Sequence, residues 1–225
     1  MEKSEKRLFF SALLYPAMFF IVMWGLKLIE IQFDLQNTII QYGVLPRDIS
    51  GIKGIFFSPF IHKDILHLSN NSLPIIILGW FLFYSYKNIA KEIFLWLFLV
   101  SGFWLWVIGR PSLHIGASGV VYALASFLFT SGLIRKNPRL TAISLIVIFL
   151  FGSMIWGIFP TKPSISWEGH LSGMLSGILI AVFFKNHGPK RKKYQWEIDE
   201  ENEKILDSQE DSQLTITYTL KKKDN

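Results

Sequence analysis

Long apolar stretches separated by short polar segments dominate the chain as far as residue 184. A helix that crosses a bilayer needs roughly 20 predominantly apolar residues, or about 17 at minimum. The pattern therefore predicts six membrane-spanning helices. These are Leu8–Ile29, Leu66–Tyr86, Ile89–Ile108, Ser118–Ile134, Leu140–Phe159 and Gly169–Phe184. Pro160 ends the fifth span, because proline cannot continue a helix interior.

Polar residues are needed to complete two of these spans. The apolar run that follows Asn71 is too short to cross a bilayer alone, so the second span must include His67, Asn70 and Asn71. The sixth span is similarly short, which keeps His170 within the helix or at its mouth. Ionisable and polar groups at membrane depth are costly and tend to be there for function.

Composition agrees with an all-α, polytopic membrane protein. Hydrophobic residues make up 51% of the chain, aromatic residues 16% and charged residues only 18%. There is no cysteine, which excludes disulfides, thiolate metal sites and a cysteine nucleophile.

The formal net charge of +6 comes partly from a basic cluster directly after the last span. The cluster comprises Lys185, Lys190, Arg191, Lys192 and Lys193. We interpret it as a cytoplasmic flank that contacts anionic lipid head groups, rather than as a nucleic-acid surface. Because Lys and Arg are more frequent in the connections on that side, both termini are predicted to be cytoplasmic.

The chain is expected to have two parts, a six-span membrane domain over residues 1–186 and a polar, mobile cytoplasmic tail over residues 187–225. Trp196, Ile198 and Leu206 are spaced for one short amphipathic helix in the tail. Leu214–Leu220 alternates as a strand would, but a lone strand is only marginally stable. The segment Gln32–Ile65 is long for a bare loop, and we expect a partly embedded hairpin there.

The direction of the spans brings polar groups together. Spans two, four and six run the same way, so their N-terminal ends share one side of the membrane. His67 and Asn71 begin span two, Ser118 begins span four and His170 begins span six. These four residues are therefore predicted to lie at similar depth, at the non-cytoplasmic end.

Their chemistry suits acyl transfer. A serine hydroxyl needs a base to take its proton, and the imidazole of His170 titrates near neutral pH. The N-terminus of a helix presents free backbone N–H groups, so Ser118 can offer its own N–H to an oxyanion. His67 and Asn71, four residues apart on one helix face, can donate to the same anion.

Small and aromatic residues support this arrangement. Gly116 and Gly119 allow a sharp bend before span four, and Gly173 and Gly177 form a small-xxx-small pattern that lets two membrane helices pack closely. Tyr122 lies one turn after Ser118, where it can pack against the imidazole. Because Asp and Glu are absent from the span interiors, a Ser–His dyad is expected rather than a triad.

Two further histidines, His62 and His114, lie on the same predicted side and are rival bases. We interpret both as structural, lining the cavity mouth or bonding loop carbonyls. A metal site is not favoured, because no helix carries two histidines four residues apart and no carboxylate joins them. No cofactor is expected.

Three segments together resemble the rhomboid intramembrane serine proteases. Gly116–Ala123 is similar to their GxSG segment, and His62–Asn71 to their HxxxxHxxxN segment. Gly169–Gly177 is similar to their last-helix histidine with its GxxxG continuation. The match covers roughly Leu8–Phe184, and the combination is far more specific than GxSG alone.

The resemblance implies a rhomboid-like fold, with Ser118 as nucleophile and His170 as base. It also implies an oxyanion hole made by His67, Asn71 and the Ser118 N–H, with Tyr122 stacked on His170. The implied reaction is hydrolysis of peptide bonds in or near transmembrane segments of membrane proteins, without metal or cofactor. The chain has Pro46-Arg47 where many bacterial members carry a Trp-Arg pair, which leaves the anchoring of the first loop open.

Two other functions stay open at this point. The first is a catalytically silent rhomboid-like protein that binds or remodels client membrane proteins, and the second is a small-solute transporter. The short, uncleaved N-terminus, without a transit-like extension, favours a prokaryotic plasma membrane as the location.

Overall fold

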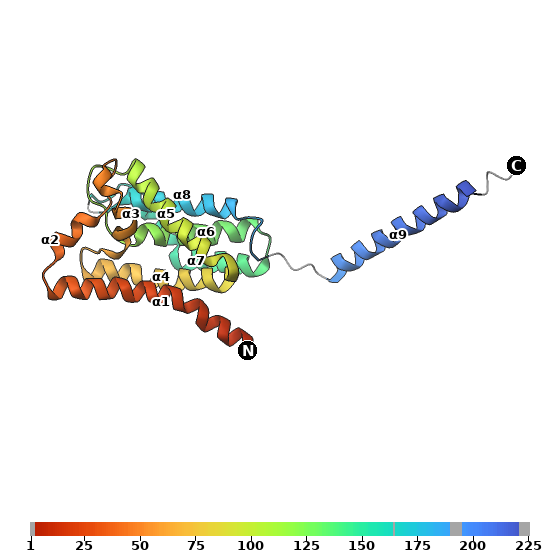
Figure 1. The fold of residues 1–225 in the computed structure, drawn as a ribbon, viewed down its shortest axis with the longest axis horizontal. Coiled ribbons are helices and arrows are strands. Elements are labelled where there is room, and N and C mark those ends of the chain that lie inside the picture. Colours follow the sequence, from red (N-terminus) through yellow and green to blue (C-terminus); the bar gives the residue numbers. More distant parts are fainter. Residues whose placement is uncertain (1–2, 164, 190–194, 221–225) are drawn as a thin grey trace. The chain divides into compact units, whose positions relative to one another are not determined.

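A computed structural model describes residues 3–163, 165–189 and 195–220. It divides into two compact units, Met1–Lys190 and Arg191–Asn225. The first unit is a bundle of helices (Figure 1). Its longer helices are α1 (Lys3–Gln32), α4 (Ile65–Tyr86), α5 (Ala90–Ile108), α6 (Ser118–Ile134), α7 (Pro138–Phe151) and α8 (Trp167–Phe183).

Each of these helices lies at one of the predicted spans, with ends that differ by a few residues. The exception is the fifth span, where α7 ends at Phe151 and a 3-10 helix continues over Gly152–Ile158. Three stretches are long and apolar enough to cross a membrane: Lys6–Gln32, Ile65–Ile108, which contains both α4 and α5, and Pro138–Ile158. The helices α6 and α8 are apolar but shorter, so the count of six crossings is consistent with the structure and remains a prediction.

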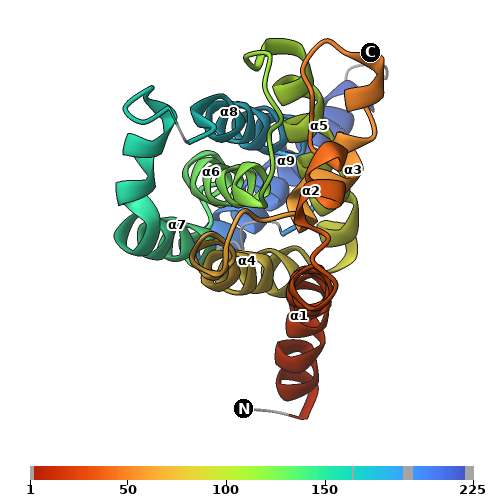
Figure 2. The same ribbon diagram turned by 90° about the vertical axis from the view of Figure 1, so that its left-hand side faces the viewer.

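Helix α6 is the centre of the bundle. It is surrounded by α4, α5, α7 and α8 when the bundle is viewed end-on (Figure 2). The five consecutive residues 120–124 are all buried, and five consecutive positions pass through every side of a helix, so α6 is covered all round along these turns. A helix that is apolar all round belongs in an interior, and here that interior lies inside a membrane bundle.

The outer helices keep large apolar side chains on the surface. Ile21 on α1, Phe149 on α7 and Phe183 on α8 are 64%, 86% and 70% exposed. In water such a surface would be an aggregation hazard, whereas in a bilayer it faces lipid tails.

Helices α6 and α8 approach each other through glycines. A Cβ atom added to Gly173 would overlap the carbonyl oxygen of Gly119, and one added to Gly177 would overlap the carbonyl oxygen of Ala123. The small-xxx-small pattern therefore lies in the contact between the two helices that carry Ser118 and His170.

Helices α4, α6 and α8 begin at the same end of the bundle, on the left in Figure 1. At their other end, side chains tie them together. The Tyr86 hydroxyl at the end of α4 donates to Ser131 Oγ on α6 at 2.7 Å. Arg135 donates to the same Ser131 oxygen at 2.8 Å and also to the carbonyl of Phe184, which ends α8. We call these four residues the far-end clasp.

The segment between α1 and α4 is a series of short helical turns rather than a hairpin. It contains α2 (Gln36–Ile39), α3 (Gly54–Phe57) and three 3-10 turns at Ile40–Tyr42, Ile49–Gly51 and Ser58–Phe60. These turns satisfy their backbone groups locally.

The Pro46-Arg47 pair anchors this segment to the end of α5. The Arg47 guanidinium donates to the carbonyls of Gly109 at 2.7 Å and Val107 at 3.2 Å. The Arg47 backbone N–H donates to Trp106, whose indole N–H in turn donates to the Asp48 carbonyl at 2.9 Å. Arg47 and Trp106 together thus hold the first loop against the end of α5.

The second unit contains α9 (Gln195–Leu220). The alternating segment Leu214–Leu220 is part of this helix and not a strand. A lone strand leaves its backbone groups without partners, whereas a helix satisfies them internally. The ion pair of Glu200 with Lys204, four residues apart at 2.7 Å, is of the kind that supports an exposed helix.

The glycine contact can be tested with a matched pair of Gly→Ala variants. We expect Gly177→Ala to lower the free energy of unfolding by about 1–3 kcal/mol, because the added methyl group must push α6 away from α8. Gly25→Ala on α1 is the control, since nothing lies within 4 Å of the added atom. Thermal unfolding in detergent measures both, and equal melting temperatures for the two variants would contradict the close contact.

Candidate active site

The predicted site residues lie on the first turns of three helices. His67 and Asn71 are on the first two turns of α4, Ser118 is the first residue of α6, and His170 is on the first turn of α8. Asp64 caps α4 by accepting a hydrogen bond from the His67 N–H at 2.7 Å. The start of α6 differs, because its N-cap residue is Ala117 and no side chain caps it. Its first backbone N–H groups are thus left for another acceptor.

The turn before Ser118 is built on Gly116. This residue has φ +108°, in the left-handed region that glycine adopts without strain. Its N–H donates to the Ser58 carbonyl at 2.8 Å. A Cβ atom here would lie 2.7 Å from His67 Nε2 and 3.7 Å from Asn71 Nδ2. Glycine is therefore required at position 116 for two reasons, its left-handed backbone conformation and the close approach of His67. The turn at Gly116 brings α4 against the start of α6.

Asn71 is buried, and its Nδ2 has no hydrogen-bond partner among the described residues. Leaving a buried donor unpaired costs about 1–3 kcal/mol, so such a group calls for a functional or structural reason. The unpaired amide lies next to the Gly116 turn, where an oxyanion formed at Ser118 would need donors.

The His170 ring is fixed from two sides. Its Nδ1 lies 2.8 Å from the Gly157 carbonyl, which can only accept, so Nδ1 carries the proton and Nε2 keeps its lone pair. Its ring stacks on Tyr122 with centroids 4.3 Å apart and an angle of 8°. The Tyr122 hydroxyl donates to the Met154 carbonyl at 2.5 Å. The result is an oriented imidazole with a free basic nitrogen.

Sequence reasoning missed the contribution of the 3-10 segment Gly152–Ile158. It supplies both carbonyls that orient His170 and Tyr122, and a Cβ at Gly157 would overlap the Tyr122 hydroxyl. Any residue can supply a backbone carbonyl, so the sequence does not reveal these acceptors. Gly157 was the only residue of the segment that could have indicated the close contact with Tyr122. Ser166, the N-cap of α8, was also missed, although serine directly before an apolar helix is a recognised start signal.

The hydroxyl of Ser118 makes no hydrogen bond to His170 within the part of the chain that the structure describes. The helices that carry them are nonetheless in contact, and a Cβ at Gly119 would lie 3.4 Å from the Gly169 carbonyl. Catalytic hydrogen bonds are often long before substrate binds and shorten in the complex. The dyad therefore stays a prediction, supported by the orientation of the ring.

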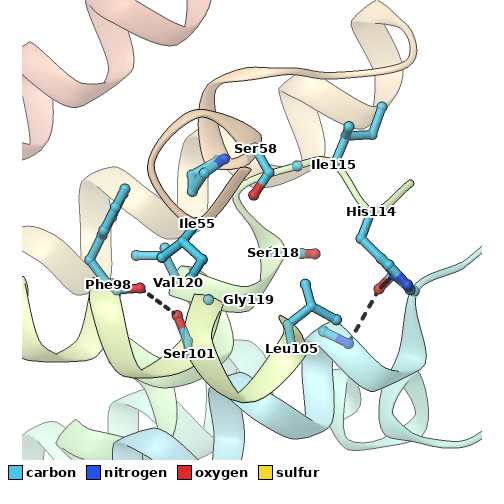
Figure 3. A pocket seen from close by; sticks show the side chains of 15 residues that line it. Ile55, Ser58, Phe98, Ser101, Leu105, His114, Ile115, Ser118, Gly119 and Val120 are labelled. Carbon is cyan, nitrogen blue, oxygen red and sulfur yellow. Dashed lines mark hydrogen bonds between the residues drawn. The ribbon is translucent and has the colours of Figure 1, made fainter. Parts of the chain in front are cut away.

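A cavity of about 30 Å³ opens beside Ser118, between α3, α5, α6 and α8. Its polar lining includes Ser58, Ser101 and His114, and Ile55 and Leu105 are among its apolar residues (Figure 3). A water needs about 10–15 Å³ of such space and several polar partners, so the cavity can hold one or two.

The two rival histidines are engaged in loop contacts. His62 is 1% exposed, and its Nε2 accepts from the Ala117 N–H at 3.4 Å. Burial lowers the pKa of His62 to about 3, which keeps it neutral and able to accept. Its carbonyl accepts from Lys27 at 2.8 Å, and Lys27 pairs with Glu30 at 2.5 Å.

Across the described ranges, no three His, Cys, Asp or Glu side chains lie close enough together to hold a metal ion. The chemistry available at the site is that of a hydroxyl, an oriented imidazole and unpaired N–H donors.

Comparison with known proteins agrees with these features. A family model described as the Rhomboid domain matches residues 50–187. Uncharacterized proteins of Mycobacterium bovis and Mycobacterium tuberculosis are 29% identical over 181 residues, covering 74% of this chain and 73% of theirs. An uncharacterized protein of Mycobacterium leprae is 31% identical over 153 residues, covering 62% of this chain and 58% of its own.

The matched region begins in the first loop and includes all three helices that carry the site. Together with the all-helical bundle and its lipid-facing surface, the match shows that this chain is a member of the rhomboid family.

Proposed function

We propose that this protein is an intramembrane serine endopeptidase that hydrolyses peptide bonds in or near transmembrane segments of membrane proteins. The observation that carries the proposal is the orientation of His170. Its Nδ1 is committed to the Gly157 carbonyl and its face to Tyr122, so Nε2 is left as a base. A general base needs one ring nitrogen with a lone pair and a fixed direction, and this arrangement of His170 supports that role.

In the proposed reaction the Ser118 oxygen attacks the substrate carbonyl carbon while His170 Nε2 takes the hydroxyl proton. The charge on the carbonyl oxygen is met by the Ser118 N–H, His67 and Asn71. The carbon–nitrogen bond then breaks, and His170 gives its proton to the leaving amine. A water, activated by His170, next hydrolyses the ester and regenerates Ser118.

The remaining features of the proposal follow from the distribution of charge. We place both termini in the cytoplasm of a prokaryotic cell, with the site toward the outer side of the plasma membrane and the basic cluster against anionic lipid. Transmembrane proteins are the proposed substrates. The proposed hydrolysis needs water, and the partly polar cavity beside Ser118 has room for it.

One observation favours a second candidate, a silent rhomboid-like protein that binds client membrane proteins. It is the absence, among the described residues, of a hydrogen bond between Ser118 and His170. Labelling of the serine separates the two candidates, because a binder has no need of an activated hydroxyl.

We expect a fluorophosphonate probe to label the purified protein at Ser118. Ser118→Ala should abolish labelling and cleavage of a model transmembrane substrate, and His170→Ala should lower both by roughly 10³-fold or more. Ser126→Ala, two turns further along α6, and His187→Ala, outside the site, are the controls and should remain active. Folded wild-type protein that is neither labelled nor active would rule out the protease.

Asn71→Ala is expected to lower kcat by roughly 10²–10³-fold with little change in KM, because an oxyanion donor acts mainly in the transition state. The melting temperature should change much less than kcat, since the side-chain nitrogen has no hydrogen bond to lose within the described ranges. The control is Asn70→Ala on the neighbouring, exposed position of α4. A loss confined to KM would contradict the oxyanion role.

Deletion of the residues after Lys190 should leave activity in detergent unchanged, because the proposed chemistry uses only the first unit. Steady-state cleavage of the same substrate by full-length and truncated protein measures this. Loss of cleavage by a truncated protein of normal melting temperature would assign the tail a part in the reaction.

A further inference from the structure

A short hydrogen bond joins the two segments that lead into the site. His114 Nδ1, in the loop before α6, lies 2.6 Å from Ser166 Oγ, the N-cap of α8. His114 precedes Ser118 by four residues, and Ser166 precedes His170 by four residues. The bond therefore links equivalent points, each one turn's length of chain before a member of the proposed dyad.

The direction of this bond is fixed by its neighbours. The Gly169 N–H donates to Ser166 Oγ at 3.2 Å, and the Arg110 carbonyl lies 3.1 Å from His114 Nε2. A carbonyl only accepts, so Nε2 carries the ring proton, and Nδ1 must accept from the Ser166 hydroxyl. Burial lowers the pKa of His114, which keeps this neutral form at neutral pH.

The same assignment removes His114 as a rival base. Both of its ring nitrogens are engaged, with Nδ1 facing Ser166 and Nε2 facing the Arg110 carbonyl. His114 is also 3% exposed, so the bond is shielded from competing water. A buried, fully bonded imidazole is suited to hold two segments in register.

Arg110 supplies a parallel connection between the same two segments. Its guanidinium donates to the carbonyls of Pro163 and Ile165, each at 2.8 Å, in the loop before α8. Its Nε lies 3.5 Å from the carboxylate of Glu168, which is 3% exposed on the first turn of α8. The loop before α8 is thus held to the loop before α6 from both sides of Ser166.

We propose that His114 and Ser166 are positioning residues that set the separation of Ser118 and His170. This rests on the proposed proteolytic function for its activity readout. The bond acts on the two segments that lead into α6 and α8, and so adds to the glycine contact between the helices themselves. Neither residue takes part in proton transfer.

The test is a double-mutant cycle with His114→Ala, Ser166→Ala and the combined variant. We expect each single variant to lower kcat and the rate of Ser118 labelling by about 10–100-fold, the range for a small misplacement of reacting groups, with KM little changed. The double variant should be no worse than the poorer single one, because both remove the same bond. Ser166→Thr keeps the hydroxyl and should restore most of the rate.

Asn137→Ala is the matched control for loss of a helix cap. Asn137 caps α7 by accepting from the Arg139 N–H at 3.1 Å, away from the site. It should lower the melting temperature to a similar extent while leaving the labelling rate unchanged. Additive losses in the cycle, or an equal loss of labelling in Asn137→Ala, would overturn the positioning role.

Hydrogen exchange gives a readout that does not depend on activity. In His114→Ala the amides of Gly169 and His170 should exchange faster than in wild type, whereas Asn137→Ala should leave them unchanged. If wild-type protein is inactive but His114→Ala still speeds amide exchange at Gly169 and His170, the proposed protease function is wrong and the connection between the two segments is supported. If wild-type protein is active but His114→Ala leaves this amide exchange unchanged, only the positioning role of His114 and Ser166 is wrong.

Discussion

The site depends on the close approach of α6 and α8. Lipid tails are as apolar as leucine side chains, so two membrane helices gain little from hiding apolar surface and are held by packing and hydrogen bonds instead. Gly173 and Gly177 let the two backbones meet, and any larger residue would meet a carbonyl oxygen of α6. That contact brings the helix starts together. The orientation of His170 and the bond between His114 and Ser166 both act within the geometry it sets.

A second theme is the use of backbone carbonyls as acceptors for site-supporting side chains. His170 donates to Gly157, Tyr122 to Met154, Lys27 to His62 and Arg110 to Pro163. Irregular backbone at or near membrane depth must find partners within the protein, because lipid offers none. Each of these contacts thus serves both partners: the loop carbonyl gains a hydrogen-bond donor, and the side chain that donates is held in one orientation.

Hydrophobic periodicity was enough to locate the helices and, through their alternating direction, to bring His67, Asn71, Ser118 and His170 to one end. It failed where the structure depends on partners with no sequence signature. The 3-10 segment after Phe151 contributes two backbone carbonyls to the site, and these could not be predicted because every residue carries the same carbonyl group. The alternating pattern of Leu214–Leu220 did not predict a strand by itself, because a strand needs a second strand to pair with, and the segment is helical.

The far-end clasp holds one end of the bundle together. Tyr86, Ser131 and Arg135 join α4, α6 and the end of α8 through side-chain hydrogen bonds. At the opposite end, beside the cavity, His114 and Arg110 hold the segments that lead into α6 and α8. Side-chain hydrogen bonds therefore hold α6 and α8 at both ends of their glycine contact, so separating the two helices would break bonds at both ends.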